Sequence, residues 1–327
     1  MPHSPNFTSA RSLSAAIIIA FLSLTVVGQT VSAGRPSSEP TVADYPYGKD
    51  SERQKFDFWK ADSAEPTPVV LLIHGGGWNR GDKSGYRGEA VQVFLDRGIS
   101  VAAINYRYIT QAMEQGVDPP VKACVEDAAR ALQTIRYKSK EWGIDGSRVG
   151  ATGTSAGACT SLWLAFHSDL AIPTATDPIS RESTRIACAA VSGAQTSLDP
   201  QELREWIPNA EYGGHAFGFW KEGRSRPEEF ELLIENREQK LPLIKEYSPI
   251  ELVSSDDPPI YLDYPNQKSP PTLGQREEDP THSAVYGVML KAKLDAAGVE
   301  TVLNYPGHED GCYESFRHFL IEKLTTD

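Results

Sequence analysis

The five residues Gly153-Thr154-Ser155-Ala156-Gly157 constrain the fold more than any other stretch of this chain. They match the pattern G-x-S-x-G, in which a sharp turn from a strand into a helix raises a serine above the edge of a sheet. The flanks agree, because residues 148–152 have the composition of a short strand and residues 156–167 that of a helix. The two glycines leave room for the close strand and helix, while the serine itself is expected in a strained backbone conformation. The motif therefore predicts Ser155 as a nucleophile.

Composition indicates a globular protein. The chain has 327 residues, of which 40% are hydrophobic and 23% charged, enough for a sizeable core. Its net charge of −12 opposes binding to a polyanion, and no block of Lys and Arg suggests nucleic acid as a partner. The composition does not indicate an oligomeric state.

The first 33 residues have the pattern of an export signal. Arg11 is the single Lys or Arg there, residues 13–27 are apolar apart from Ser and Thr, and Val31-Ser32-Ala33 offers small residues for cleavage. An uncleaved membrane anchor is the alternative, but the apolar run is shorter than the roughly 20 residues of a membrane span. We therefore expect a secreted or periplasmic protein with no stable membrane insertion after cleavage, and a linker over residues 34–46.

From residue 47 to residue 327, strand-like and helix-like stretches alternate, which predicts one α/β domain. The expected strands are residues 55–59, 69–73, 99–105, 148–152, 186–192, 259–262 and 299–305. The expected helices are residues 89–97, 121–142, 156–167, 283–297 and 313–324. This order favours a mostly parallel central sheet with helices on both faces. Residues 194–258 depart from it, with aromatic residues among charges and glycines, and we interpret them as a helical cap insertion.

The four cysteines are scattered and include no C-x-x-C pair, which argues against a zinc site or a thioredoxin-like motif. Cys159 and Cys188 lie in apolar contexts and are predicted to be buried free thiols. An exported protein could form one disulfide from the set that also includes Cys124 and Cys312, but the spacing does not select a pair. No metal-ligand spacing is present, so we expect neither metal nor cofactor.

A nucleophilic serine needs a base, a group that orients the base, and donors for an oxyanion. With this type of serine turn, the order along the chain is Ser, then Asp or Glu, then His. His308 fits the base, because it follows the last expected strand in Tyr305-Pro306-Gly307-His308, where glycines let a loop fold over the sheet. The alternative for His308 is an exposed loop histidine.

The other histidines fit this role less well. His318 lies inside the last expected helix, while His167, His215 and His282 break the expected order or lie in unsuitable elements. We therefore predict His308 as the base.

The acid is expected in the loop that precedes the helix at residue 283. Asp279 lies in that loop, in Glu277-Glu278-Asp279-Pro280, and is our prediction. Asp263 ends the preceding strand and is the alternative, although it comes early in the turn. Asp310, beside the histidine loop, is a third candidate. For each of these the competing interpretation is a solvated loop carboxylate.

The loop His74-Gly75-Gly76-Gly77 follows a buried apolar strand and is predicted to form the oxyanion hole. Successive glycines can direct N–H groups at one oxygen, and the N–H of Ala156 completes the set with Gly76 and Gly77. His74 is expected to be structural. Trp78 either lines a substrate pocket, as a substrate-binding residue, or packs in the core.

Together these motifs resemble the α/β-hydrolase esterase/lipase family, in particular its feruloyl-esterase-like and hormone-sensitive-lipase-like carboxylesterases. The resemblance is carried by His74-Gly75-Gly76-Gly77-Trp78 with Gly81-Asp82-Lys83, Asn105-Tyr106-Arg107, the serine motif and Tyr305-Pro306-Gly307-His308. It covers residue 47 to the C-terminus. The chain departs from the family in its acid loop, which has Asp263-Tyr264-Pro265 in place of the common His-Gly and is long.

The resemblance implies an α/β-hydrolase fold and a serine carboxylic-ester hydrolase. Ser155, His308 and Asp279 would act through an acyl-enzyme on a small or carbohydrate-linked ester. Two alternatives stay open: an amide-cleaving hydrolase, such as a formamidase or peptidase, on the same triad, and a non-catalytic binding protein with a hydrolase fold.

Overall fold

The computed structural model describes residues 39–311 and 313–326. The predicted signal peptide, its membrane-anchor alternative and the first part of the predicted linker lie outside the described residues. Within the described part of the chain, no helix has the length and apolarity needed to cross a membrane.

A sheet of nine strands runs through the described domain, in the order β1-β2-β4-β3-β5-β6-β7-β8-β9. Their bounds are β1 Val42–Pro46, β2 Lys55–Trp59, β3 Thr67–Ile73, β4 Ser100–Ile104, β5 Ile144–Thr154, β6 Cys188–Ser192, β7 Ile260–Asp263, β8 Thr301–Tyr305 and β9 His308–Glu309. Strands β4, β3, β5, β6, β7 and β8 are parallel to one another, whereas β1, β2 and β9 pair antiparallel at the margins. The predicted mostly parallel sheet is confirmed.

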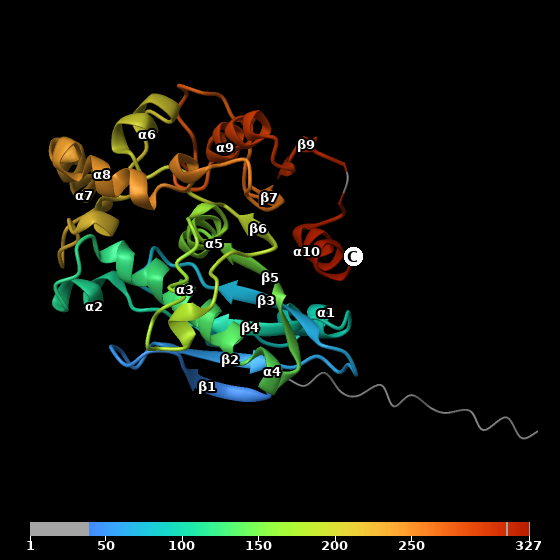
Figure 1. Cartoon of the computed structure of the whole chain (residues 1–327). Helices are drawn as coiled ribbons and strands as arrows, with labels where there is room; N and C mark the ends of the chain where they lie inside the picture. The colour runs from blue at the N-terminus through green and yellow to red at the C-terminus, as the bar shows by residue number, and fades with distance from the viewer. Residues whose placement is uncertain (1–38, 312, 327) are drawn as a thin grey trace, which may run out of the picture. The chain divides into compact units, whose positions relative to one another are not determined.

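Helices cover both faces of this sheet (Figure 1). Their bounds are α1 Glu89–Leu95, α2 Ile109–Glu114, α3 Pro120–Tyr137, α4 Ser139–Trp142, α5 Ala156–Phe166, α6 Pro200–Trp206, α7 Arg226–Glu235, α8 Arg237–Tyr247, α9 Val285–Ala297 and α10 Phe316–Thr325. Alternate residues of β3 enter different cores: Leu71 packs in the cluster with α3 and α5, and Leu72 in the cluster with α1 and α10. Because every residue of β3 is buried, its continuous apolar run is explained by cover on both faces.

The register of the parallel strands gathers their carboxyl ends at one edge. Ile73 of β3 pairs with Gly153 of β5, Gly153 with Val191 of β6, and Val191 with Leu262 of β7. The loops that follow β3, β5 and β7 therefore leave the sheet side by side, which is where ligands bind in open α/β sheets.

Three local predictions differ from the structure. The predicted linker contains β1, an edge strand whose Tyr45 packs on Phe56. The predicted helix over residues 121–142 is interrupted at Lys138, which separates α3 from α4. The predicted loop after residue 305 contains the two-residue strand β9.

The regular secondary structure within residues 194–258, the predicted cap insertion, is helical. It contains α6, α7 and α8 together with the short 3₁₀ turns η3 Gly214–Phe217 and η4 Pro249–Leu252. The remaining 3₁₀ turns, η1 Lys83–Gly85 and η2 Ile179–Arg181, lie in other loops.

Cysteines 124, 159 and 188 are buried and free, as predicted for Cys159 and Cys188. Cys312 lies outside the described residues. Burial raises the pKa of Cys188 to about 12, which keeps its thiol protonated and unreactive.

Candidate active site

Ser155 occupies the turn between β5 and α5 with φ 55° and ψ −122°, a conformation that L-residues rarely adopt. Its N–H donates to the carbonyl of Ser192 at the end of β6, at 3.0 Å. Helix α5 passes so close to β3 that a Cβ on Gly157 would lie 2.1 Å from the carbonyl oxygen of Ile73. The strained serine predicted from the motif is confirmed, and the glycine explains how the helix can begin there.

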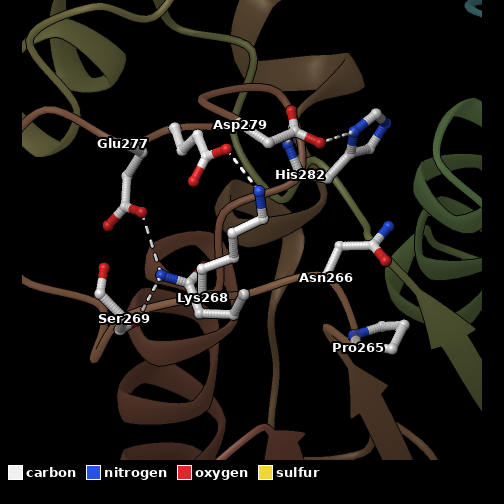
Figure 2. Close-up of a pocket in the computed structure, with 9 residues that line it drawn as sticks. Pro265, Asn266, Lys268, Ser269, Glu277, Asp279 and His282 are labelled. Carbon is white, nitrogen blue, oxygen red and sulfur yellow. Dashed lines mark hydrogen bonds and ion pairs between the residues drawn. The ribbon is translucent and has the colours of Figure 1, made fainter.

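The histidine that reaches Ser155 is His282. Its Nε2 lies 3.0 Å from Ser155 Oγ. Its Nδ1 lies 2.9 Å from Asp279 Oδ2 (Figure 2). A carboxylate only accepts, so Nδ1 carries the proton that it donates to Asp279. The unprotonated Nε2 can then accept the hydroxyl proton of Ser155. Asp279 and His282 both come from the loop between β7 and α9.

The prediction that His308 is the base is wrong. Tyr305-Pro306-Gly307-His308 forms a tight turn in which Gly307 has φ 87°, and His308 pairs antiparallel with Tyr305. Pro followed by a glycine with positive φ is the pattern of a hairpin turn, which sends the chain back along β8 instead of over the sheet. The exposed imidazole stacks on Tyr305 and faces Asp310 at 3.4 Å.

Asp279 is the carboxylate that contacts the imidazole. Its second oxygen, Oδ1, accepts from the backbone N–H groups of Thr281 and His282, both at 3.2 Å. Asp263 instead lies near Ser192 Oγ at 3.5 Å, and burial raises its pKa. Asp310 accepts from the backbone of Leu303 in the β8–β9 hairpin. Among the three candidate acids, Asp279 is thus the one that contacts the imidazole of His282.

The sequence contained a signal for His282. Asp279-Pro280-Thr281-His282 places an acid and a base three residues apart, so one turn of chain can bring them together. His282 also follows Asp279 and therefore keeps the order Ser, Asp, His. The expectation that the base lies in a loop near the end of the chain argues against His282, and the structure overturns this expectation.

The glycine loop after β3 lies against Ser155. Gly76, Gly77, Ser155 and His282 line one pocket of about 580 Å³. Gly76, Gly77 and Trp78 all have positive φ, at 104°, 60° and 52°, so the loop turns sharply beside the serine. Ala156 is the first residue of α5, where backbone N–H groups have no acceptor within the helix. The predicted oxyanion donors are thus close to the candidate nucleophile.

Trp78 does not line the described pockets, which corrects its assignment as a substrate-binding residue. Its side chain is fully buried, and its indole Nε1 donates to Thr160 Oγ1 of α5 at 3.0 Å. The ring packs beside Tyr212 and His215. Trp78 therefore ties the glycine loop to the helix that begins at the serine.

Two other motifs noticed in the sequence support the same loop. Tyr106 donates from its hydroxyl to the carbonyl of His74 at 2.8 Å, and the two rings stack. Asn105 accepts from the backbone of Lys83 at 2.7 Å, while the buried Lys83 ammonium pairs with Asp57 at 2.7 Å. These residues hold the glycine loop in position.

His74 is structural, as predicted. Its Nδ1 lies 2.9 Å from the carbonyl of Gly75, and its Nε2 lies 3.2 Å from the Arg53 guanidinium. Because the guanidinium only donates, Nε2 must be unprotonated. Burial lowers the pKa of His74 to about 4, which agrees with a neutral ring.

His282 also lines a second pocket, of about 450 Å³, together with Asp279 and the polar residues around Lys268 (Figure 2). The Lys268 ammonium pairs with Glu278 there. Among the described residues, no group of three His, Cys, Asp or Glu side chains is placed to hold a metal ion.

A family model named BD-FAE matches residues 57–267, more than half of the chain. The chain belongs to the BD-FAE family. This family consists of α/β-hydrolase esterases, in agreement with the resemblance seen in the motifs. The matched part of the BD-FAE domain contains Ser155 and the glycine loop but ends before Asp279 and His282.

Curated relatives match only in part. Esterase LipI of Mycobacterium tuberculosis (strain ATCC 25618 / H37Rv) is 31% identical over 104 residues, which are 32% of this chain and 30% of LipI. The chain spans only 4% of 5-methylorsellinic acid synthase of Aspergillus terreus, another relative.

Solved structures match over most of the chain. An acetyl ester-xyloside bifunctional hydrolase from Caldicellulosiruptor lactoaceticus has a TM-score of 0.58 and 22% identity, covering 82% of this chain and 87% of that one. A truncated carbohydrate esterase from gut microbiota has a TM-score of 0.62 and 18% identity, covering 88% and 98%. These likenesses show the α/β-hydrolase fold.

Proposed function

We propose that this protein is a serine hydrolase of carboxylic esters, with Ser155 as nucleophile, His282 as base and Asp279 as the group that orients the base. One observation carries the proposal: Ser155 Oγ lies 3.0 Å from His282 Nε2, and His282 Nδ1 lies 2.9 Å from the Asp279 carboxylate, so the three side chains form a continuous hydrogen-bonded triad. Membership of an esterase family and the name of LipI support the ester as the bond that is cleaved.

In the proposed reaction, Ser155 Oγ attacks the ester carbonyl while His282 Nε2 takes the hydroxyl proton. The negative charge that develops on the carbonyl oxygen is stabilised by backbone N–H groups of Gly76, Gly77 and Ala156. Asp279 keeps the imidazole in the tautomer with a proton on Nδ1 and stabilises the imidazolium. His282 then protonates the leaving alcohol, and water releases the acyl group by the same steps in reverse.

The substrate is proposed to be a small or carbohydrate-linked ester. The two similar structures named above are a carbohydrate esterase and a hydrolase of an acetyl ester and a xyloside, which supports a sugar as the alcohol part. A pocket of about 580 Å³ beside Ser155 suits a ligand of a few hundred daltons.

Replacing Ser155 tests the proposal. Ser155→Ala should lower kcat on aryl acetates by about 10⁴- to 10⁶-fold, the range seen when a triad serine is removed. Ser63→Ala, an exposed serine outside the site, is the matched control and should keep wild-type rates. Labelling by a phosphonate ester, read by mass spectrometry, should modify Ser155 in the wild type.

Two results would contradict the proposal. Unlabelled Ser155 in folded protein would favour a non-catalytic hydrolase fold. Faster cleavage of an anilide than of the aryl ester with the same acyl group would favour an amide-cleaving enzyme.

A further inference from the structure

Cationic side chains line the pocket beside Ser155, although the whole chain carries a net charge of −12. In the described part of the chain, the residues that line this pocket include two arginines, Arg80 and Arg226, but no Asp or Glu. Arg80 comes from the glycine loop and is exposed, whereas Arg226 begins α7 in the cap insertion. The neighbouring carboxylate of Asp279 is already engaged by His282. An incoming substrate therefore meets cations near the scissile bond.

Three polar side chains converge on Gly77. A Cβ at that position would lie 3.3 Å from Arg226 Nη2, 3.7 Å from His215 Nε2 and 3.8 Å from the Tyr212 hydroxyl. A distance of 3.3 Å is tight even for a single carbon atom, so these side chains pack directly against the predicted oxyanion loop. Arg226 and Tyr212 both line the pocket, and each carries a hydrogen-bond donor.

The Tyr212 hydroxyl lacks a partner. The side chain is 7% exposed, and its buried oxygen has no hydrogen bond within the described part of the chain. Buried hydroxyls in folded proteins are nearly always satisfied, so an orphan donor that borders a pocket points to a ligand. Burial raises the pKa of Tyr212 well above its usual value, which keeps the phenol protonated and able to donate.

The Arg226 side chain is partly exposed, and an ion pair anchors its guanidinium. Its Nη1 donates to Glu229 Oε2 at 2.8 Å, and the Glu229 side chain is 2% exposed. This ion pair engages Nη1 and leaves Nη2 beside Gly77. An anchored guanidinium and a phenol hydroxyl together can bind the two oxygens of one carboxylate.

We propose that the preferred substrates are esters carrying a free carboxylate close to the scissile bond, and that Arg226 and Tyr212 bind this carboxylate, with Arg80 at the rim. The inference rests on the proposed ester hydrolysis and adds the substrate class. The carboxylate could belong to the acyl part, as in a half-ester of a dicarboxylic acid, or to the alcohol part. Either source presents the same anion to the same two donors.

Matched ester pairs test both sources. On the acyl side, 4-nitrophenyl hydrogen succinate is compared with 4-nitrophenyl butyrate, and on the alcohol side 3-acetoxybenzoate with 3-acetoxybenzamide. In at least one pair, kcat/KM should be about 10- to 100-fold higher for the carboxylate member, the range expected of a charge-assisted hydrogen bond. Added salt should reduce this ratio, because the attraction is electrostatic.

Variants assign the preference to residues. Arg226→Gln and Tyr212→Phe should each bring the kcat/KM ratio within the pair closer to one. Because Arg226→Gln leaves Glu229 unpaired, the double variant Arg226→Gln/Glu229→Gln removes both charges and should show the same loss. Lys221→Gln removes a charge from the exposed part of the same segment and should keep the wild-type ratio.

The outcomes separate this inference from the proposed function. Hydrolysis of both members of both pairs at equal kcat/KM would overturn the carboxylate preference and leave ester hydrolysis intact. A carboxylate preference that survives in both the Tyr212→Phe and the double variant would overturn the assignment to these residues. Absence of any Ser155-dependent ester hydrolysis would instead contradict the proposed function.

Discussion

Single residues determine the chemistry available at the edge of this sheet. Ser155 is held at φ 55°, which costs a non-glycine residue about 1–3 kcal/mol. The backbone bonds from Ser155 to Ser192 and from Cys159 to Ser155 maintain that conformation from both sides. The hydroxyl is thereby presented to His282, and the strain is supported by the strands and helix around it.

Replacing the two candidate histidines should distinguish their roles. His282→Ala should lower kcat on an aryl acetate by about 10⁴-fold or more, because the base that accepts the Ser155 proton is lost. His308→Ala should stay within about twofold of wild type, since among the described residues the exposed ring contacts Tyr305 and Asp310 and not Ser155. Steady-state kinetics on both variants check this, and a large loss in His308→Ala with an active His282→Ala would reverse the assignment.

The two carboxylates can be compared in the same way. Asp279→Asn should lower kcat by about 10³- to 10⁴-fold, because an amide no longer holds the proton on His282 Nδ1. Asp263→Asn should preserve activity to within about threefold, as Asp263 contacts Ser192 and not the imidazole. Rates are measured from pH 6 to 9. An active Asp279→Asn protein would remove Asp279 from the triad.

At the scale of elements, the loop between β7 and α9 carries two members of the triad, Asp279 and His282. Amide side chains from other segments hold this loop. Asn209 of the cap insertion donates to the carbonyl of Glu277 at 2.8 Å and accepts from its N–H at 3.0 Å. Gln195 donates to the carbonyl of Thr281 at 2.7 Å. A long loop is thus ordered by contacts outside itself.

We expect Asn209→Ala to reduce kcat about tenfold while leaving the fold intact, because two hydrogen bonds that position the Asp279 loop are lost. Each such bond contributes about 0.5–1.5 kcal/mol. Asn236→Ala is the matched control, since the Asn236 side chain donates to the carbonyl of Leu232 within the cap. Kinetics and thermal melts are recorded for both. Equal activity of the two variants would show that the hydrogen bonds of Asn209 do not position Asp279 and His282.

At the scale of the whole molecule, buried neutral histidines couple stability to pH. His74 has a pKa of about 4 in the folded protein, against about 6.5 when unfolded. Between these values the unfolded chain binds more protons, so the free energy of unfolding falls as pH decreases from 6.5 towards 4. The loss from His74 amounts to about 3 kcal/mol, and burial lowers the pKa of His215 in the same direction.

His74→Gln should therefore weaken the acid sensitivity, even if it lowers stability at neutral pH. Urea unfolding at pH 4.5, 5.5 and 7 gives the free energy of unfolding for each protein. The wild type should lose more stability than the variant between pH 7 and 4.5, because Gln has no proton to bind. Parallel pH dependences for the two proteins would show that His74 is not held neutral.

Much of this architecture follows from local sequence. The apolar run of β3 can only be covered on both faces, and the glycines at 153 and 157 permit the close turn that exposes Ser155. The glycine loop follows from its position directly after β3, because the carboxyl ends of parallel strands meet at one edge. Such features depend on residues adjacent in the chain, so periodicity and turn chemistry predict them.

Only the tertiary structure decided which histidine meets Ser155. His282 and His308 both follow Ser155 and Asp279 in sequence, and their separation in space depends on how two loops leave β7 and β8. The Pro306-Gly307 turn directs His308 back along its own strand, while Asn209, Gln195 and Asp279 hold the other loop over the serine. The same reason applies to Trp78 and Arg226, whose burial and direction depend on contacts with segments remote in sequence. Local patterns determined the serine and its turn, and long-range packing selected its partners.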